Sequence, residues 1–135
     1  MKKERSVAVI IENNEGKILL LQRGEGASHY RGKWESVGGK VDDNETPLQT
    51  AKREVKEEIA VDVEIIETLF EAEDYVEEID TLFEETVFKG KILDEPVIQE
   101  PHKCSGLMWY TKNELKYLDL SPYTQDDAKK LGWFD

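Results

Sequence analysis

Residues 38–61 constrain the fold most, because a glycine pair, a helix start and a dense set of acids follow one another there. Thr46 followed by Pro47, with Gln49 three positions after the threonine, is typical of a helix N-cap with a capping box. The pattern predicts a helix that begins near residue 47 and ends at about Ile59. The rest of the chain is organised around this helix.

The predicted helix has an apolar face and an adjoining acidic face. At about 100° per residue, one narrow stripe collects the apolar side chains Leu48, Ala51, Val55 and Ile59. The neighbouring arc collects the acids Glu54, Glu57 and Glu58. We therefore expect one face to pack against a sheet while its neighbour carries a concentrated negative charge.

Three carboxylates at this spacing repel one another. In a half-buried cleft they do not all ionise without raised pKa values, unless a cation offsets the repulsion. Oxygen ligands without histidine or cysteine suit Mg²⁺ or Mn²⁺ better than zinc. The competing interpretation is a solvated acidic helix face, and the three glutamates alone do not decide between the two.

The remaining elements alternate between strands and helices. Residues 6–12 and 17–23 are apolar runs joined by a predicted hairpin turn at 13–16, and their near-continuous apolarity predicts strands covered on both faces. A short strand is expected at 33–37, a bulged strand after the helix, a turn at 75–80, a returning strand at 81–92 and a last helix ending near residue 131. This order predicts an α/β sandwich.

Composition limits the classes of partner. A net charge of −12 argues against binding a nucleic-acid polymer, which needs basic patches that neutralise phosphates. Cys104 is the only cysteine, so no intrachain disulfide forms, and the first residues lack a long apolar run. We expect a single domain over residues 1–135, in the cytoplasm and away from membranes, while the pattern gives no indication of the oligomeric state.

The spacing of the central stretch resembles the Nudix box, G-x5-E-x7-R-E-U-x-E-E-x-G-U with U a bulky aliphatic residue. The matching positions are Gly39, Glu45, Arg53, Glu54, Val55, Glu57, Glu58 and Val61. Ala60 is the one departure, at a position where glycine suits a left-handed helix C-cap. The resemblance implies a Nudix-type α/β/α sandwich with a mixed β-sheet.

The resemblance also implies a metal site. In this family divalent metal is held by the helix glutamates, by a carbonyl of the glycine turn and often by an acid of a later loop. The residues at these positions are Glu54, Glu57, Glu58, Gly38 and Glu100. Mg²⁺ or Mn²⁺ is the implied cofactor. For Glu100 a surface acid is the competing interpretation, because the later loop has no fixed spacing.

The family's supporting pair corresponds to Glu45 and Arg53, which implies an ion pair that orients the metal ligands. In the family, water attacks phosphorus while one carboxylate takes the proton. Glu57 or Glu54 is favoured as the ligand nearest that water, and Glu100 is the alternative base.

Three further residues are candidates for substrate binding. Arg23, at the end of the second strand, and Lys40, beside the glycine turn, are placed to contact phosphates. Trp34 is a candidate for the border of a base pocket, although a core position suits it at least as well.

The segments around the box resemble small MutT-type enzymes. This favours hydrolysis of a nucleoside triphosphate to the monophosphate and pyrophosphate, with oxidised nucleotides among the candidate substrates. ADP-ribose, or another nucleoside diphosphate derivative, is the alternative substrate. A non-catalytic Nudix-fold binding module is the alternative of another class, and the intact set of mutually repelling glutamates argues against it.

Overall fold

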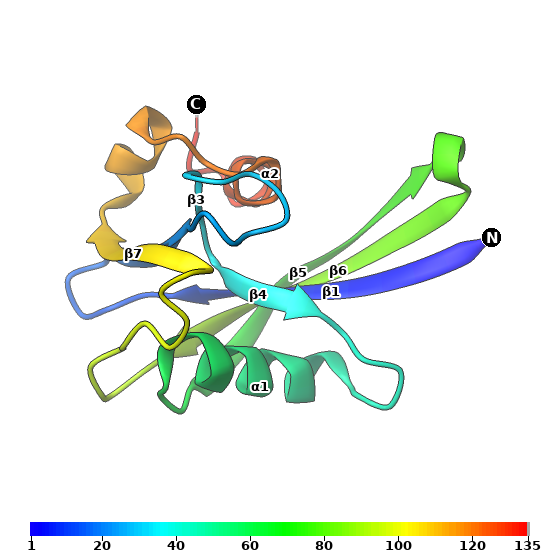
Figure 1. Ribbon diagram of the computed structural model, residues 1–135. Helices are drawn as coiled ribbons and strands as arrows, with labels where there is room; N and C mark the ends of the chain where they lie inside the picture. Colours follow the sequence, from blue (N-terminus) through cyan, green and yellow to red (C-terminus); the bar gives the residue numbers. More distant parts are fainter. Residues whose placement is uncertain (135) are drawn as a thin grey trace.

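The computed structural model describes residues 1–134, which form strands with a helix on each side of the body (Figure 1). The strands are β1 (Lys2–Ile11), β2 (Ile18–Arg23), β3 (Trp34–Glu35), β4 (Val37–Lys40), β5 (Glu64–Val76), β6 (Thr81–Lys91) and β7 (Cys104–Tyr110). The helices are α1 (Pro47–Ile59) and α2 (Pro122–Lys130), with short 3₁₀ turns η1 (Glu77–Ile79) and η2 (Lys112–Tyr117). Within residues 1–134, no helix combines the length and apolarity needed to cross a membrane.

The strands divide into two sheets. One has the order β4-β1-β6-β5 and is mixed, because β1 runs parallel to β6 and antiparallel to β4. The other has the order β3-β2-β7 and is antiparallel. The predicted α/β fold with a mixed sheet is therefore confirmed.

Two details of the strand prediction are wrong. The turn at 13–16 forms, but β1 and β2 enter different sheets and share only an isolated bridge between Glu12 and Ile18. The expected strand at 33–37 is likewise split at Ser36 into β3 and β4, one in each sheet. Local apolar pattern predicts a strand, but only long-range pairing selects its partner.

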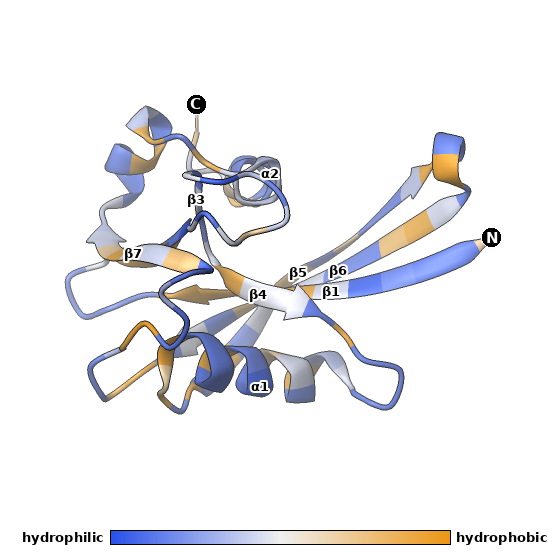
Figure 2. Ribbon diagram, in the orientation of Figure 1, coloured by the Kyte–Doolittle hydropathy of each residue, from blue (hydrophilic) through white to orange (hydrophobic). Residues whose placement is uncertain are grey.

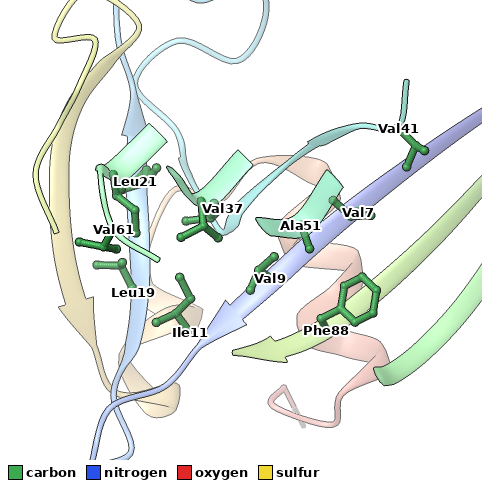
Figure 3. Close-up of a cluster of buried hydrophobic side chains, with 12 residues drawn as sticks. Val7, Val9, Ile11, Leu19, Leu21, Val37, Val41, Ala51, Val61 and Phe88 are labelled. Atoms are coloured by element: carbon green, nitrogen blue, oxygen red, sulfur yellow. The ribbon is translucent and has the colours of Figure 1, made fainter. Parts of the chain in front are cut away.

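Alternate side chains of β1 supply two separate cores. Val7, Val9 and Ile11 pack in the cluster that contains Ala51 and Val55 of α1 (Figure 3). The intervening residues of β1 pack in a second cluster with residues of η2 and the segments flanking α2. This two-sided burial confirms that the apolar run is covered on both faces, and it places α1 and α2 on opposite sides of the strands (Figure 1).

The capping pattern of α1 is confirmed, but one residue of its apolar stripe is misplaced. The Thr46 side chain accepts from the backbone N–H of Gln49, and the Gln49 side chain accepts from that of Thr46. Leu48 is 43 % exposed and borders an open groove beside Phe88. Periodicity gives the direction of a side chain, not whether a neighbouring element covers it.

The long hairpin of β5 and β6 projects beyond the body together with the first half of β1, and η1 closes its tip (Figure 1). Figure 2 shows that this projecting part of β1 is hydrophilic. The predicted bulge in β5 is confirmed by two register shifts, between Ile65 and Glu67 and between Thr68 and Phe70. The turn is shorter than predicted, because residues 75 and 76 still pair with β6.

Ala60 adopts the left-handed conformation that glycine prefers, with φ 64° and ψ 21°, and its N–H donates to the Lys56 carbonyl. We expect Ala60→Gly to raise the free energy of unfolding by about 0.5–1 kcal/mol, because relief of backbone strain exceeds the entropy that glycine adds to the unfolded chain. Lys52→Gly, within the same helix, should lower it by about 1 kcal/mol. Urea unfolding measures both, and a loss of stability in Ala60→Gly would show that the alanine methyl group contributes more than the strain costs.

Candidate active site

The two glycines of β4 allow α1 to approach the sheet closely. A Cβ on Gly39 would lie 2.4 Å from the Glu54 carboxyl carbon, and a Cβ on Gly38 would lie 2.3 Å from the Val7 carbonyl oxygen. The Gly38 N–H donates to Glu58 Oε2 at 3.3 Å. Gly39 therefore makes room for an acidic side chain, whereas Gly38 makes room for the neighbouring strand.

Arg53 joins three of the acids. Its guanidinium donates to both carboxylate oxygens of Glu45, at 2.7 and 2.9 Å. One of its terminal nitrogens also donates to Glu54 at 3.0 Å and to Glu57 at 3.2 Å. Hydrogen bonds from Arg53, with a further one from Thr50, lower the pKa of Glu45 to about 2. The Glu45–Arg53 pair thus holds a fixed positive charge beside the acidic face of α1.

The glutamates of α1 differ in their exposure. Burial raises the pKa of Glu54, opposed by the charge of Arg53. Burial and the Glu54 charge raise the pKa of Glu58 well above its usual range, although the Gly38 N–H favours the ionised form. The Glu57 side chain is 54 % exposed and lies at the rim. Two of the three acids are therefore held where ionisation is unfavourable without a positive partner.

These acids share a cavity of about 520 Å³ with residues from distant parts of the chain. Its charged lining residues are Arg23, Glu35, Glu54, Glu57, Glu58, Glu100 and Lys103. Residues 24–26 and 102–103 meet beside it, since the Gly24 and Gly26 N–H groups donate to the Lys103 and His102 carbonyls at 2.7 and 2.9 Å. The fold thereby brings the predicted loop acid Glu100 to the acids of α1.

The chemistry of this donor set suits a hard divalent cation, because the cavity offers several carboxylates and two of them are ionised only at a cost. In the described chain, no three acidic, histidine or cysteine side chains already form a ligand cluster. Glu54 and Glu57 each direct one oxygen to Arg53 instead. The carboxylates are thus gathered in one cavity, with part of their hydrogen-bonding capacity used by the arginine.

The three predicted substrate-binding residues have different positions. Arg23 lines the acidic cavity and donates to Glu35 at 2.5 Å. Lys40 lines a second cavity, and its Nζ lies 3.7 Å from Glu4 Oε1. Trp34 borders neither of these cavities and instead packs edge-on against Tyr110, with ring centroids 5.2 Å apart. Its position matches the core alternative.

The second cavity, of about 280 Å³, adjoins the acidic one, because Arg23 and Glu35 line both. It lies between the sheet and α2, and its lining includes Ser36, Gly38, Phe83, Glu85, Tyr123 and Asp127. No spacing in the sequence singles out the residues that β6 and α2 contribute to the second cavity, nor Glu35 and Lys103 of the first cavity. Only the tertiary fold places them together.

Comparison with known families decides the assignment. Residues 2–134 match the family model described as the NUDIX domain. The chain belongs to the Nudix family. The glutamates of α1, the Glu45–Arg53 pair and Gly39 of β4 are therefore the Nudix box in three dimensions.

Several curated Nudix proteins match the chain over part of its length. It is 44 % identical over 62 residues to the 8-oxo-dGTP diphosphatase of Proteus vulgaris, covering 46 % of the chain and 54 % of that protein. It is 43 % identical over 65 residues to the CTP pyrophosphohydrolase of Escherichia coli (strain K12), covering 48 % and 47 %. The matched part thus spans about half the length of these relatives.

Solved structures match over nearly the whole chain. The MutT NUDIX hydrolase from Burkholderia pseudomallei has a TM-score of 0.82 at 23 % identity, covering 97 % of this chain and 99 % of that one. The E. coli ORF135 protein has a TM-score of 0.78 at 26 % identity, covering 96 % and 88 %. These similarities establish that the fold is that of Nudix proteins.

Proposed function

We propose that this Nudix protein hydrolyses a nucleoside triphosphate to the monophosphate and pyrophosphate. The observation that carries the proposal is the pair of adjoining cavities. One is rich in carboxylates and suits the phosphate end of a nucleotide, and the other has aromatic side chains and suits the nucleoside end. The names of the partial relatives, an 8-oxo-dGTP diphosphatase and a CTP pyrophosphohydrolase, support the same class of substrate.

We infer that Mg²⁺ or Mn²⁺ is held by Glu54, Glu57, Glu58, the Gly38 carbonyl and Glu100. When bound, the cation offsets phosphate charge and lowers the pKa of coordinated water. The Glu45–Arg53 pair positions these ligands, since Arg53 contacts Glu54 and Glu57 directly. A bound cation would add positive charge beside Glu54 and Glu58, whose ionised forms burial disfavours.

Glu57 is the proposed proton acceptor for the attacking water. Glu54 and Glu58 lie deeper, whereas Glu57 is exposed enough to pass the proton on to bulk water. Glu100 is the alternative base, and in the structure its carboxylate lies 3.2 Å from Lys103 Nζ. Arg23 and Lys103 line the same cavity and are proposed to contact the phosphates.

The nucleoside end is proposed to occupy the second cavity. Phe83 and Tyr123 line it, and aromatic side chains stack favourably on a base. Lys40 lies at the same cavity, where it can approach the sugar or the adjoining phosphate. Trp34 has no proposed role in binding, because it packs against Tyr110.

Gly39→Ala tests whether the close approach of β4 to α1 matters for metal binding. The new Cβ would displace the Glu54 carboxylate, so we expect affinity for Mn²⁺, measured by calorimetry, to fall about 10–100-fold with a comparable loss of kcat/KM. Gly16→Ala is the matched control: it strains a turn at φ 75° but has nothing within 4 Å of its new Cβ. Unchanged Mn²⁺ affinity in folded Gly39→Ala would show that Glu54 is not a ligand.

The proposal is tested by comparing kcat/KM for canonical and oxidised nucleoside triphosphates with kcat/KM for ADP-ribose, all with Mg²⁺. We expect at least one triphosphate to be preferred. An advantage of about a hundredfold for ADP-ribose, equal to about 2.7 kcal/mol, would instead establish the alternative substrate. Tight nucleotide binding without turnover would establish the binding-module alternative.

Two broader features accompany the proposal. We infer a cytoplasmic enzyme, supported by the single cysteine, because cytosolic proteins rarely use disulfides. The substrate is a free nucleotide and not a nucleic-acid polymer, since a net charge of −12 would repel an extended phosphate backbone.

A further inference from the structure

We propose that Thr50 is a positioning residue for the metal site, acting through Glu45 and Arg53 on the carboxylates of α1. The inference rests on the proposed function, because it assumes that these carboxylates hold the cation. Thr50 occupies a position that the Nudix box leaves unspecified, within the seven residues between Glu45 and Arg53.

The hydroxyl of Thr50 is fully buried and donates to a carboxylate. Thr50 lies one turn after the N-cap of α1, and its exposed fraction is 0 %. Its Oγ1 lies 2.9 Å from Glu45 Oε1 and 3.2 Å from the Thr46 carbonyl oxygen. That carbonyl already accepts from the Thr50 N–H at 3.0 Å, so the single hydroxyl proton is better used by the charged oxygen of Glu45.

Packing alone does not account for threonine at this position. The other buried residues of α1 are apolar: Ala51, Val55 and Ile59. Threonine has a lower helix propensity than alanine, and a buried hydroxyl is unfavourable unless it is hydrogen-bonded. The contact with Glu45 is therefore the feature that distinguishes Thr50 from its buried neighbours.

Thr50 gives the Glu45 carboxylate a short, rigid anchor on the helix. Arg53 pairs with both carboxylate oxygens, but its long side chain can move together with Glu45 as one unit. The Asp42 N–H, which belongs to the preceding loop, is a longer contact at 3.3 Å. The Thr50 hydroxyl is attached one bond from Cβ, so it fixes the Glu45–Arg53 pair relative to the backbone of α1.

The orientation of that pair determines how Arg53 meets the proposed ligands. One terminal nitrogen of Arg53 donates to Glu54 at 3.0 Å and to Glu57 at 3.2 Å. A shift of the Glu45 carboxylate would therefore move a positive charge relative to two carboxylates at once. Contacts run without a break from Thr50 through Glu45 and Arg53 to Glu54 and Glu57.

The test measures Mn²⁺ affinity by calorimetry in the absence of nucleotide. Thr50→Val keeps the shape of the side chain and removes the hydroxyl. We expect it to lower Mn²⁺ affinity about three- to tenfold, less than the 10–100-fold loss that is usual when a direct partner of a metal ligand is removed. Thr50→Ser keeps the hydroxyl and should bind Mn²⁺ within about twofold of the wild type. Thr50→Ala is the second variant if valine does not fit, and circular dichroism establishes that each variant is folded.

Thr81→Val is the matched control for the loss of a buried threonine hydroxyl. Thr81 is 3 % exposed, and its hydroxyl donates to the Ile79 carbonyl at 2.9 Å, at the tip of the β5–β6 hairpin (Figure 1). Its substitution should lower the free energy of unfolding and leave Mn²⁺ affinity unchanged. This comparison separates a role in the metal site from a role in stability alone.

A double-mutant cycle tests the route through Glu45. In a Glu45→Ala background, Thr50→Val should cause no further loss of Mn²⁺ affinity, because the acceptor of the hydroxyl is already absent. Wild-type affinity in folded Thr50→Val, or an equal loss with and without Glu45, would overturn the inference. A wild type that hydrolysed no nucleoside triphosphate would overturn the proposed function, while the Mn²⁺ comparison would still decide the role of Thr50.

Discussion

Glu57→Gln is expected to lower kcat by about 10²–10⁴-fold while leaving the fold intact, because it removes both a proposed metal ligand and the proposed proton acceptor. The side chain is 54 % exposed, and its contact with Arg53 lies at the rim of the cavity, so the substitution removes little that stabilises the protein. Steady-state kinetics over a range of Mg²⁺ concentrations measure the effect, and thermal unfolding checks the fold.

Glu78→Gln is the matched control, since Glu78 is exposed in η1 at the far end of the β5–β6 hairpin. The Glu78→Gln variant should hydrolyse the substrate at the wild-type rate. A wild-type kcat for Glu57→Gln at limiting Mg²⁺ would show that neither role belongs to this residue. Loss of activity that saturating Mg²⁺ restores fully would assign Glu57 to metal binding and exclude it as the base.

Asp127→Asn is expected to stabilise the protein at neutral and alkaline pH. The pKa of Asp127 is raised from 3.8 to about 9 in the folded state, so folded protein binds more protons than unfolded protein between these values. The favourable contribution of protonated Asp127 is complete below pH 3.8 and is lost progressively as the pH rises toward 9. Its limiting slope is about 1.4 kcal/mol per pH unit.

The stability difference between Asp127→Asn and the wild type should therefore grow with pH, exceeding its value at pH 4.5 by about 2 kcal/mol or more at pH 8. Urea unfolding at a series of pH values measures it. Asp126→Asn, the neighbouring control on the exposed side of α2, should show no comparable rise. A difference that is constant between pH 4.5 and 8 would mean that Asp127 ionises normally in the folded protein.

Structure that depends on neighbouring residues is predictable from the sequence. The caps of α1 form by contacts three residues apart, and the box places Glu54, Glu57 and Glu58 on one arc through helix geometry alone. Gly39 is assigned to the same site because its spacing from the helix is part of the motif. These features depend only on nearby residues, so they can be recognised in the sequence alone.

Features that depend on distant parts of the chain were not predictable in the same way. The predicted hairpin of β1 and β2 is wrong, because an apolar run does not specify which sheet it enters. Asp127 was not singled out, since an aspartate within the polar sequence of α2 shows no sign that β6 and the helix enclose it. Ala60 lies between these cases: the motif marked its position, and the structure gives its left-handed conformation.

The most direct test of the proposed activity is phosphorus NMR of the products from the preferred nucleoside triphosphate, with Mg²⁺ and with EDTA. We predict nucleoside monophosphate and pyrophosphate in equal amounts with Mg²⁺, and no turnover with EDTA, because the proposed role of the carboxylates around α1 requires a bound cation. Release of orthophosphate and nucleoside diphosphate, or undiminished turnover in EDTA, would contradict the account.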